Sequence, residues 1–116
     1  YEGAEWDAVI VPGGWAPDKI RMNQAALAIV RKAVEQKKVV AAICHGGWVL
    51  ASANVIQGRK VTSYIAIKDD MIHAGGEGTD EAVVVDNGIV TSRTPDDLPA
   101  FCRAIVDVLS RQPVAV

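Results

Sequence analysis

An unbroken apolar run that leads directly into a thiol constrains this chain more than any other feature of its sequence. Residues 38–43 read KVVAAI, and Cys44-His45-Gly46-Gly47 follow without a spacer. A short apolar run bounded by a glycine-containing turn is typical of a strand that is buried on both faces, as strands of parallel sheets are. We therefore expect residues 38–43 to form a central strand of an α/β sheet, with Cys44 at its carboxyl end.

The other segments of the chain alternate between strand and helix patterns. Expected strands cover residues 6–11, 38–43, 61–64, 81–86 and 89–92, and expected helices cover residues 23–36, 48–53 and 67–73. A last helix follows the N-cap pattern Thr94-Pro95 and ends before Pro113, while Asn87-Gly88 is a strong hairpin signal between the last two strands. This order predicts one α/β domain, a three-layer flavodoxin-like sandwich with a mostly parallel sheet and a late β-hairpin.

The charge and cysteine content exclude several classes of function. The 116 residues include 12 Lys and Arg against 14 Asp and Glu, and no basic run indicates a nucleic-acid partner. The apolar runs are too short to cross a membrane. With only two cysteines, we expect no disulfide framework and a cytoplasmic location. Metal-ligand spacing and phosphate-binding glycine motifs are both lacking, so we expect neither a metal nor a cofactor.

The segment Ala42-Ile43-Cys44-His45-Gly46 matches the nucleophile elbow, in which small residues stand two positions before and after the nucleophile. The turn forces the nucleophile into a strained backbone conformation, and larger neighbours would collide. Cys44 would stand at the carboxyl edge of the sheet, where α/β sheets bind ligands, and at a helix start whose N–H groups favour a thiolate. The pattern predicts a catalytic nucleophile rather than a buried structural cysteine.

Three further features are expected near this thiol. His45 could pair with the thiolate and carry a proton, or it could be an exposed polar residue at the first turn of a helix. The segment Pro12-Gly13-Gly14 ends the preceding strand, and its backbone could supply an oxyanion donor beside the N–H of His45, although most such triplets are plain turns. Asp18 either orients His45 or is an ordinary surface carboxylate.

The second cysteine and the second histidine receive no catalytic role. Cys102 shares the apolar face of the last helix with Leu98 and Ile105, which predicts that it packs in the core. His73 follows an apolar pair near a helix end, which predicts a C-terminal cap or a surface residue.

Four stretches of sequence, in this order, carry a resemblance to a known family. They are DAVIVPGGWAPDKIR, AICHGG, GRKVTSYIAIKDDMIHAG and VVVDNGIVTSRTPDDLPAFCRAI. The chain resembles the PfpI-type intracellular protease and glyoxalase/deglycase family, in the DJ/PfpI branch of the class I glutamine-amidotransferase-like superfamily. The resemblance implies that Cys44 is the nucleophile, His45 its partner, and the backbone amides of Gly14 and His45 the oxyanion hole. It also implies that Asp18 reaches the histidine of a neighbouring subunit, in a homo-oligomer (a dimer or higher) with the site near the interface.

The chain also departs from the family pattern. Gly47-Trp48 follows the Cys-His-Gly triplet where the family usually has a proline, and we expect Trp48, together with Gly13 and Trp15, to line the substrate pocket. The family carries a glutamate beside the sulfur in an N-terminal segment that would precede Tyr1. We therefore expect residues 1–116 to be the C-terminal two-thirds of the usual domain, without its N-terminal strands, and another chain or further residues to complete the fold.

The leading functional hypothesis is a cysteine-dependent hydrolase or lyase. Its substrate would be a small carbonyl compound such as methylglyoxal, or a glycated adduct, as in glyoxalase III or deglycases, or a peptide, as in C56 peptidases. The alternative is a redox-sensing general stress protein or chaperone in which Cys44 oxidises with little turnover. An ammonia-supplying amidotransferase is disfavoured, because that triad needs a distant histidine followed by an acid, and His73 is followed by Ala74.

Overall fold

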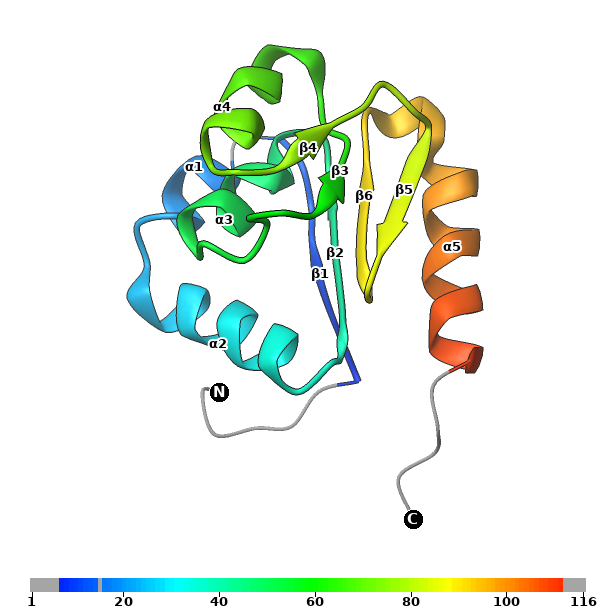
Figure 1. Cartoon of the computed structure of the whole chain (residues 1–116), viewed down its shortest axis with the longest axis horizontal. Coiled ribbons are helices and arrows are strands. Elements are labelled where there is room, and N and C mark those ends of the chain that lie inside the picture. The colour runs from blue at the N-terminus through cyan, green and yellow to red at the C-terminus, as the bar shows by residue number, and fades with distance from the viewer. Residues whose placement is uncertain (1–6, 15, 112–116) are drawn as a thin grey trace.

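Parallel strands form the centre of the structure, a computed structural model that describes residues 7–14 and 16–111 (Figure 1). The main sheet has the order β1-β2-β6-β5, with β1 at Ala8–Val11, β2 at Val39–Ile43, β6 at Ile89–Ser92 and β5 at Val83–Asp86. β1 pairs with β2 and β2 with β6 in parallel, while β5 pairs antiparallel with β6. The expected mostly parallel sheet with a late hairpin is confirmed, and the part of the first expected strand at Trp6 lies outside the described residues.

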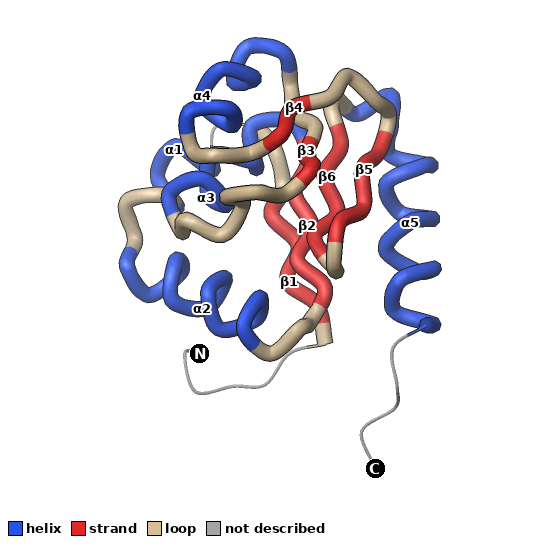
Figure 2. The backbone as a smooth tube through the Cα atoms, viewed as in Figure 1, coloured by secondary structure: helices blue, strands red, loops and turns tan. Residues whose placement is uncertain are grey.

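Strand β2 is buried along its whole length, as its apolar sequence predicts. Alternate residues point to opposite faces of the sheet. Val39, Ala41 and Ile43 pack in one cluster with Phe101 and Ile105 of α5 (Leu98–Arg111). Val40 and Ala42 pack on the other face, against α2 (Gln24–Glu35) and α3 (Gly47–Ser52). The result is a three-layer sandwich, with α5 on one side of the sheet and the other helices opposite (Figures 1 and 2).

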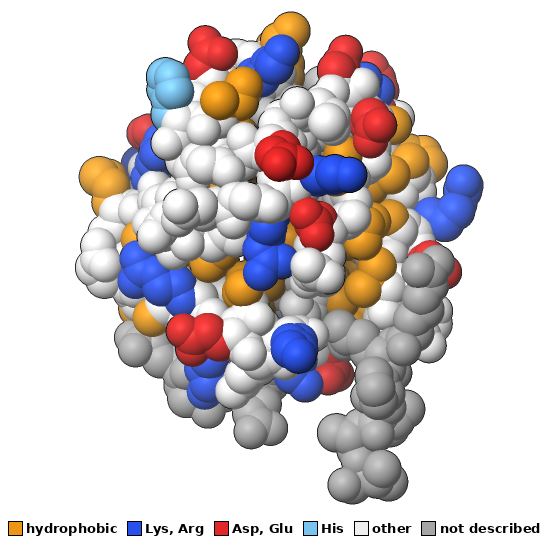
Figure 3. Space-filling view, in the orientation of Figure 1, with side chains coloured by type: hydrophobic (Ala, Val, Ile, Leu, Met, Phe, Trp, Pro, Cys, Tyr) orange, Lys and Arg blue, Asp and Glu red, His pale blue; other side chains and the backbone are white. Residues whose placement is uncertain are grey.

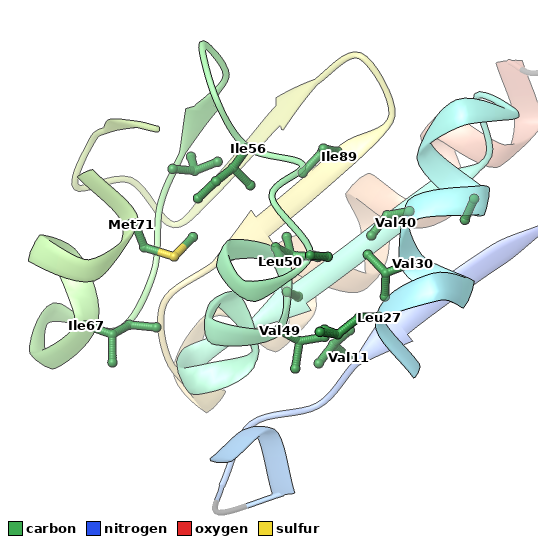
Figure 4. Close-up of a cluster of buried hydrophobic side chains, with 14 residues drawn as sticks. Val11, Leu27, Val30, Val40, Val49, Leu50, Ile56, Ile67, Met71 and Ile89 are labelled. Carbon is green, nitrogen blue, oxygen red and sulfur yellow. The ribbon is translucent and has the colours of Figure 1, made fainter. Parts of the chain in front are cut away.

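The larger of the two cores lies on the side of α2 and α3. Its labelled side chains converge from β1, β2, β6 and the helices (Figure 4). In α2 the buried face consists of Leu27, Val30 and Ala33, and the side chain of Asn23 caps the helix by accepting a hydrogen bond from the N–H of Ala26 at 3.1 Å. The apolar spacing of residues 23–36 therefore predicts this helix correctly.

The hairpin between β5 and β6 turns at Asn87-Gly88, where both residues have positive φ, 50° and 85°. Such angles match a tight hairpin turn whose twist suits the flanking strands. The expected strand at residues 81–86 is shorter in the structure, because β5 begins at Val83. The turn chemistry thus located the hairpin, although one strand was extended too far.

The expected strand at residues 61–64 is wrong beyond its first residue. β3 is only Lys60–Val61, and it pairs in parallel with β4 (Glu77–Gly78) in a separate small sheet. The N–H of Thr62 leaves this pairing and donates to Thr91 Oγ1 at 2.9 Å. The chain then forms a 3₁₀ turn at Ile65–Ile67 and helix α4 at Lys68–His73, whose last residue is exposed, as the sequence predicts for His73.

The prediction that Cys102 packs in the core is also wrong, because this residue is exposed. Phe101 and Ile105 point at the sheet, and residue 102 lies about 100° further around the helix, on a flank that the described strands do not cover. Leu98, on the same flank, is 43% exposed, and hydrophobic side chains line the face of β5 and α5 that Figure 3 shows.

The opposite edge of the sheet is open in the described residues. β1 has β2 as its single neighbour there, and Ile10 is 55% exposed. That further strands complete the sheet stays a prediction. None of the described helices combines the length and apolar character that a membrane span needs.

An ion pair closes the corner between β6 and α5. The expected side-chain cap by Thr94 is absent, and a 3₁₀ turn at Pro95–Asp97 precedes α5 instead. Asp97 is buried, and it accepts hydrogen bonds from Arg93 Nε at 2.9 Å and Nη2 at 3.1 Å. These bonds hold the pKa of Asp97 below its ordinary value, and hydrogen bonds to Asp97 and to Asp80 raise the pKa of Arg93.

We predict that replacing Asp97 by Asn removes a pH-dependent part of the stability. Because the folded-state pKa is lowered, the contribution is complete above the ordinary value of 3.8 and is lost as the pH falls below it. Urea unfolding of the wild type and Asp97→Asn should differ most at neutral pH and converge in acid. A difference that stays constant across this range would contradict the prediction.

Candidate active site

Cys44 stands at the carboxyl end of β2 in a conformation that few non-glycine residues adopt. Its φ is 58°, in the left-handed region. It begins a 3₁₀ turn at Cys44–Gly46, and helix α3 starts at Gly47, one residue before the expected range 48–53, so the sulfur lies one short turn ahead of this helix. The strained turn that the small–x–Cys–x–small pattern predicts is confirmed, and such strain is typical of functional sites.

Two glycines let the loop after β1 lie directly against this turn. A Cβ added to Gly46 would be 2.7 Å from the carbonyl oxygen of Val11, closer than folded proteins tolerate. A Cβ added to Gly13 would be 2.9 Å from the Cβ of Cys44 and 3.6 Å from its sulfur. Gly13, in the segment Pro12-Gly13-Gly14 that we expected near the thiol, therefore lies directly beside Cys44.

His45 is half-buried beside the thiol. Its Nδ1 lies 3.4 Å from the sulfur of Cys44, within reach of a hydrogen bond that involves sulfur. The centroid of its ring is 4.9 Å from that of Trp48 and 5.1 Å from that of Tyr64. The imidazole is thus held between aromatic side chains with one nitrogen at the sulfur, which is the geometry that proton exchange with a thiol requires.

Tyr64 is a site residue that the sequence analysis did not assign. It follows the short strand β3, and its ring reaches His45 across the carboxyl edge of the main sheet. The available signal was an aromatic residue at the end of the expected strand 61–64, which alone does not indicate a neighbour of residue 45. Arg93 also lies close to Cys44 along the sheet edge. The residues before them, Ile43 on β2 and Ser92 on β6, are paired in register.

Three other residues were predicted at the site, namely Gly14, Asp18 and Trp15. Gly14 follows Gly13, is exposed and has a φ of 75°, a backbone conformation that favours glycine. Asp18 lies on the short helix α1 (Ala16–Ile20) and is exposed, and its side chain makes no hydrogen bond or ion pair with another described residue. Trp15 lies outside the described residues.

This arrangement places an imidazole beside a thiol at the carboxyl end of β2. A sulfur at a sheet edge can attack an electrophilic carbon, and a neighbouring imidazole can move the protons that the attack and release of product require. In residues 7–14 and 16–111, no three His, Cys, Asp or Glu side chains converge where they could share a metal ion.

The sequence matches a family model and is similar to several known proteins. The model of the DJ-1/PfpI family matches residues 2–108. Deglycase PfpI of Pyrococcus furiosus is 52% identical over 105 residues, 90% of this chain and 63% of that protein. Protein/nucleic acid deglycase 2 of Escherichia coli is 49% identical over 107 residues, 91% of this chain and 62% of that protein.

A solved structure matches closely as well. It is a two-domain protein of Anabaena variabilis with DJ-1/ThiJ/PfpI-like and ferritin-like domains, and it superposes with a TM-score of 0.90 at 48% identity. The match covers 91% of this chain and 30% of that protein. The chain spans less than two-thirds of the length of both deglycases.

We predict that Gly46→Ala destabilises the protein by about 1–3 kcal/mol, because the new methyl group meets a carbonyl oxygen of the backbone. Gly78→Ala is the matched control, since its Cβ would meet only ordinary contacts, the nearest at 3.4 Å. Urea unfolding measures both variants. Equal unfolding midpoints for the two would show that the loop and the turn are not held together as tightly as these distances indicate.

Proposed function

This chain belongs to the DJ-1/PfpI family, and from that membership we propose that it carries the nucleophile of a cysteine-dependent hydrolase or lyase. The proposed substrate is a reactive carbonyl compound, methylglyoxal or a glycated adduct. The observation that carries the proposal is Cys44 at positive φ with Nδ1 of His45 3.4 Å from its sulfur. The names of two relatives as deglycases support carbonyl chemistry.

The proposed reaction with methylglyoxal begins when the sulfur of Cys44 bonds to the aldehyde carbon. The aldehyde oxygen takes up a proton, which gives a hemithioacetal. A base then shifts the hydrogen of this carbon to the neighbouring ketone carbon, so that the first carbon becomes a thioester carbonyl and the second an alcohol. Water hydrolyses the thioester, releasing lactate and restoring the thiol, and no external oxidant or reductant is consumed.

We assign the proton transfers to His45 and the stabilisation of the anionic oxygen to the backbone N–H groups of Gly14 and His45. The contact of Gly13 with Cys44 supports this assignment, because it brings the loop to the sulfur. Trp48 and Gly13 would line the pocket. We place the activity in the cytoplasm, which the free thiols of Cys44 and Cys102 support.

The test is glyoxal and methylglyoxal consumption by the protein with Cys44→Ala, beside Cys102→Ala as the matched control. We expect loss of at least about a thousandfold for Cys44→Ala, since nothing else replaces a nucleophile, and little change for Cys102→Ala. Casein cleavage is measured in parallel. If cleavage of casein requires Cys44 while glyoxal and methylglyoxal are not consumed, the substrate is a peptide and not an aldehyde.

Oxidation by mild peroxide distinguishes the alternative role, that of a redox sensor, from the proposed enzyme. Because Cys102 is exposed and Cys44 is half-buried, solvent accessibility alone favours oxidation of Cys102. Preferential oxidation of Cys44 under mild peroxide, in a protein without turnover, would favour the redox role over the enzyme. Mass spectrometry of the two cysteine peptides gives the result.

We also propose that the protein is a homo-oligomer, a dimer or higher, in which Asp18 orients His45 of a neighbouring subunit. The exposure of Asp18 on α1, without a partner in the described part of its own chain, supports this arrangement. In a mixture of Asp18→Ala and Cys44→Ala subunits, one complete site can form between two defective chains.

Co-expression of the two variants should therefore restore activity that neither has alone, to about a quarter of wild type for a randomly mixed dimer. Homo-oligomers of each variant are the controls. A mixture no more active than the Asp18→Ala protein alone would show that Asp18 does not serve the neighbour's site.

A further inference from the structure

We propose that Trp48 is a positioning residue for His45, and that Asp70 and Arg21 hold Trp48 in place. This inference rests on the proposed function only in taking Cys44 as the nucleophile. It concerns side chains from α3, from α4 and from the segment after α1, which lie on the same side of the sheet (Figure 1). Neither Asp70 nor Arg21 was a predicted site residue.

The first observation is the aromatic surround of the imidazole. The rings of His45 and Trp48 are tilted by 60° with centroids 4.9 Å apart, and Tyr64 contributes a second ring at 5.1 Å and 43°. Tilted contacts of this kind are favourable and depend on orientation. A turn of the imidazole about its side-chain bonds would break these contacts at the same time as it moved Nδ1 away from the sulfur.

The second observation is that Trp48 itself is fixed at its other sides. Its Nε1–H donates a hydrogen bond of 2.8 Å to Asp70 Oδ2. The guanidinium of Arg21 lies 5.1 Å from the centre of its ring, in cation–π contact, and Arg21 Nε donates to Ser52 Oγ at 3.0 Å. A partly exposed indole with neither contact would be free to change rotamer.

These contacts form a continuous series from α4 to the sulfur. Asp70 sets the plane of Trp48, Trp48 sets the plane of His45, and His45 presents Nδ1 to Cys44. Catalytic groups need support of this kind, because small errors in orientation cost large factors in rate. The physical prediction is that a change at Asp70 alters the reactivity of Cys44 although the two residues are not in contact.

The experiment measures alkylation of Cys44 by iodoacetamide in the native full-length protein, across a range of pH. Cysteine peptides are quantified by mass spectrometry, so Cys102 is an internal reference. The variants are Asp70→Ala, Asp70→Asn and Asp69→Ala. Asp69 is the matched control, because it is the adjacent acidic residue in the first turn of the same helix, and its loss reproduces any effect on helix stability.

We expect Asp70→Ala to slow alkylation of Cys44 about three- to tenfold at neutral pH and to leave Cys102 unchanged, because one hydrogen bond that orders the indole is lost. Asp70→Asn keeps an oxygen acceptor and should restore most of the rate. Trp48→Phe keeps a ring but removes the donor, so it should resemble Asp70→Ala, and the double variant should add little further loss.

The charged and titratable groups around His45 and Trp48 make the Asn variant decisive. Cys44 and Tyr64 face His45, while Arg21 and Asp70 face Trp48. If Asp70 acted through its negative charge rather than through the hydrogen bond, Asp70→Asn would be as slow as Asp70→Ala. That result would overturn the proposal, as would an Asp70→Ala rate equal to that of Asp69→Ala.

The failure of the proposed function would look different. In that case Cys44 of the wild type would react no faster than Cys102, and Cys44→Ala would keep the carbonyl turnover. The positioning proposal is judged separately, from the ratio of the Asp70→Ala and Asp69→Ala rates at Cys44.

Discussion

The contact between the loop after β1 and the turn after β2 is the constraint on which the candidate site depends. Added methyl groups at Gly46 and Gly13 would be 2.7 Å from the Val11 carbonyl oxygen and 2.9 Å from the Cβ of Cys44. Side chains there would push the two segments apart and separate the glycine backbone from the sulfur. Parallel pairing of β1 and β2 brings both segments to one edge, and the glycines allow them to touch.

The strained conformation of Cys44 needs a rigid support. β2 supplies it, because it is buried on both faces and hydrogen-bonded on both sides, to β1 and to β6. A residue at positive φ persists where its surroundings determine the backbone more strongly than its own preference does. Just beyond the sheet, Arg93 forms ion pairs with Asp80 and Asp97. These ion pairs also hold the end of β6 that lies beside Cys44.

The predictions from sequence were wrong where a local pattern was used to infer a tertiary contact. The apolar spacing of the last helix correctly places Ile105 in the core, but it also predicts a core position for Cys102, which is exposed. Helical periodicity defines a stripe without defining how wide the opposing sheet is. Similarly, the β-branched segment after Lys60 has strand propensity, but Thr62 bonds to the side chain of Thr91 and ends the pairing.

The parallel sheet, the late hairpin and the strained turn at Cys44 could be predicted because each follows from a short-range pattern: apolar runs, Asn-Gly, and small residues around a nucleophile. The sequence also indicated that the glycine loop after β1 lies near the thiol. The surroundings of His45 depend instead on the tertiary fold. The rings of Trp48 and Tyr64, and the bond from Trp48 to Asp70, join segments up to 22 residues apart, and no local pattern encodes such contacts.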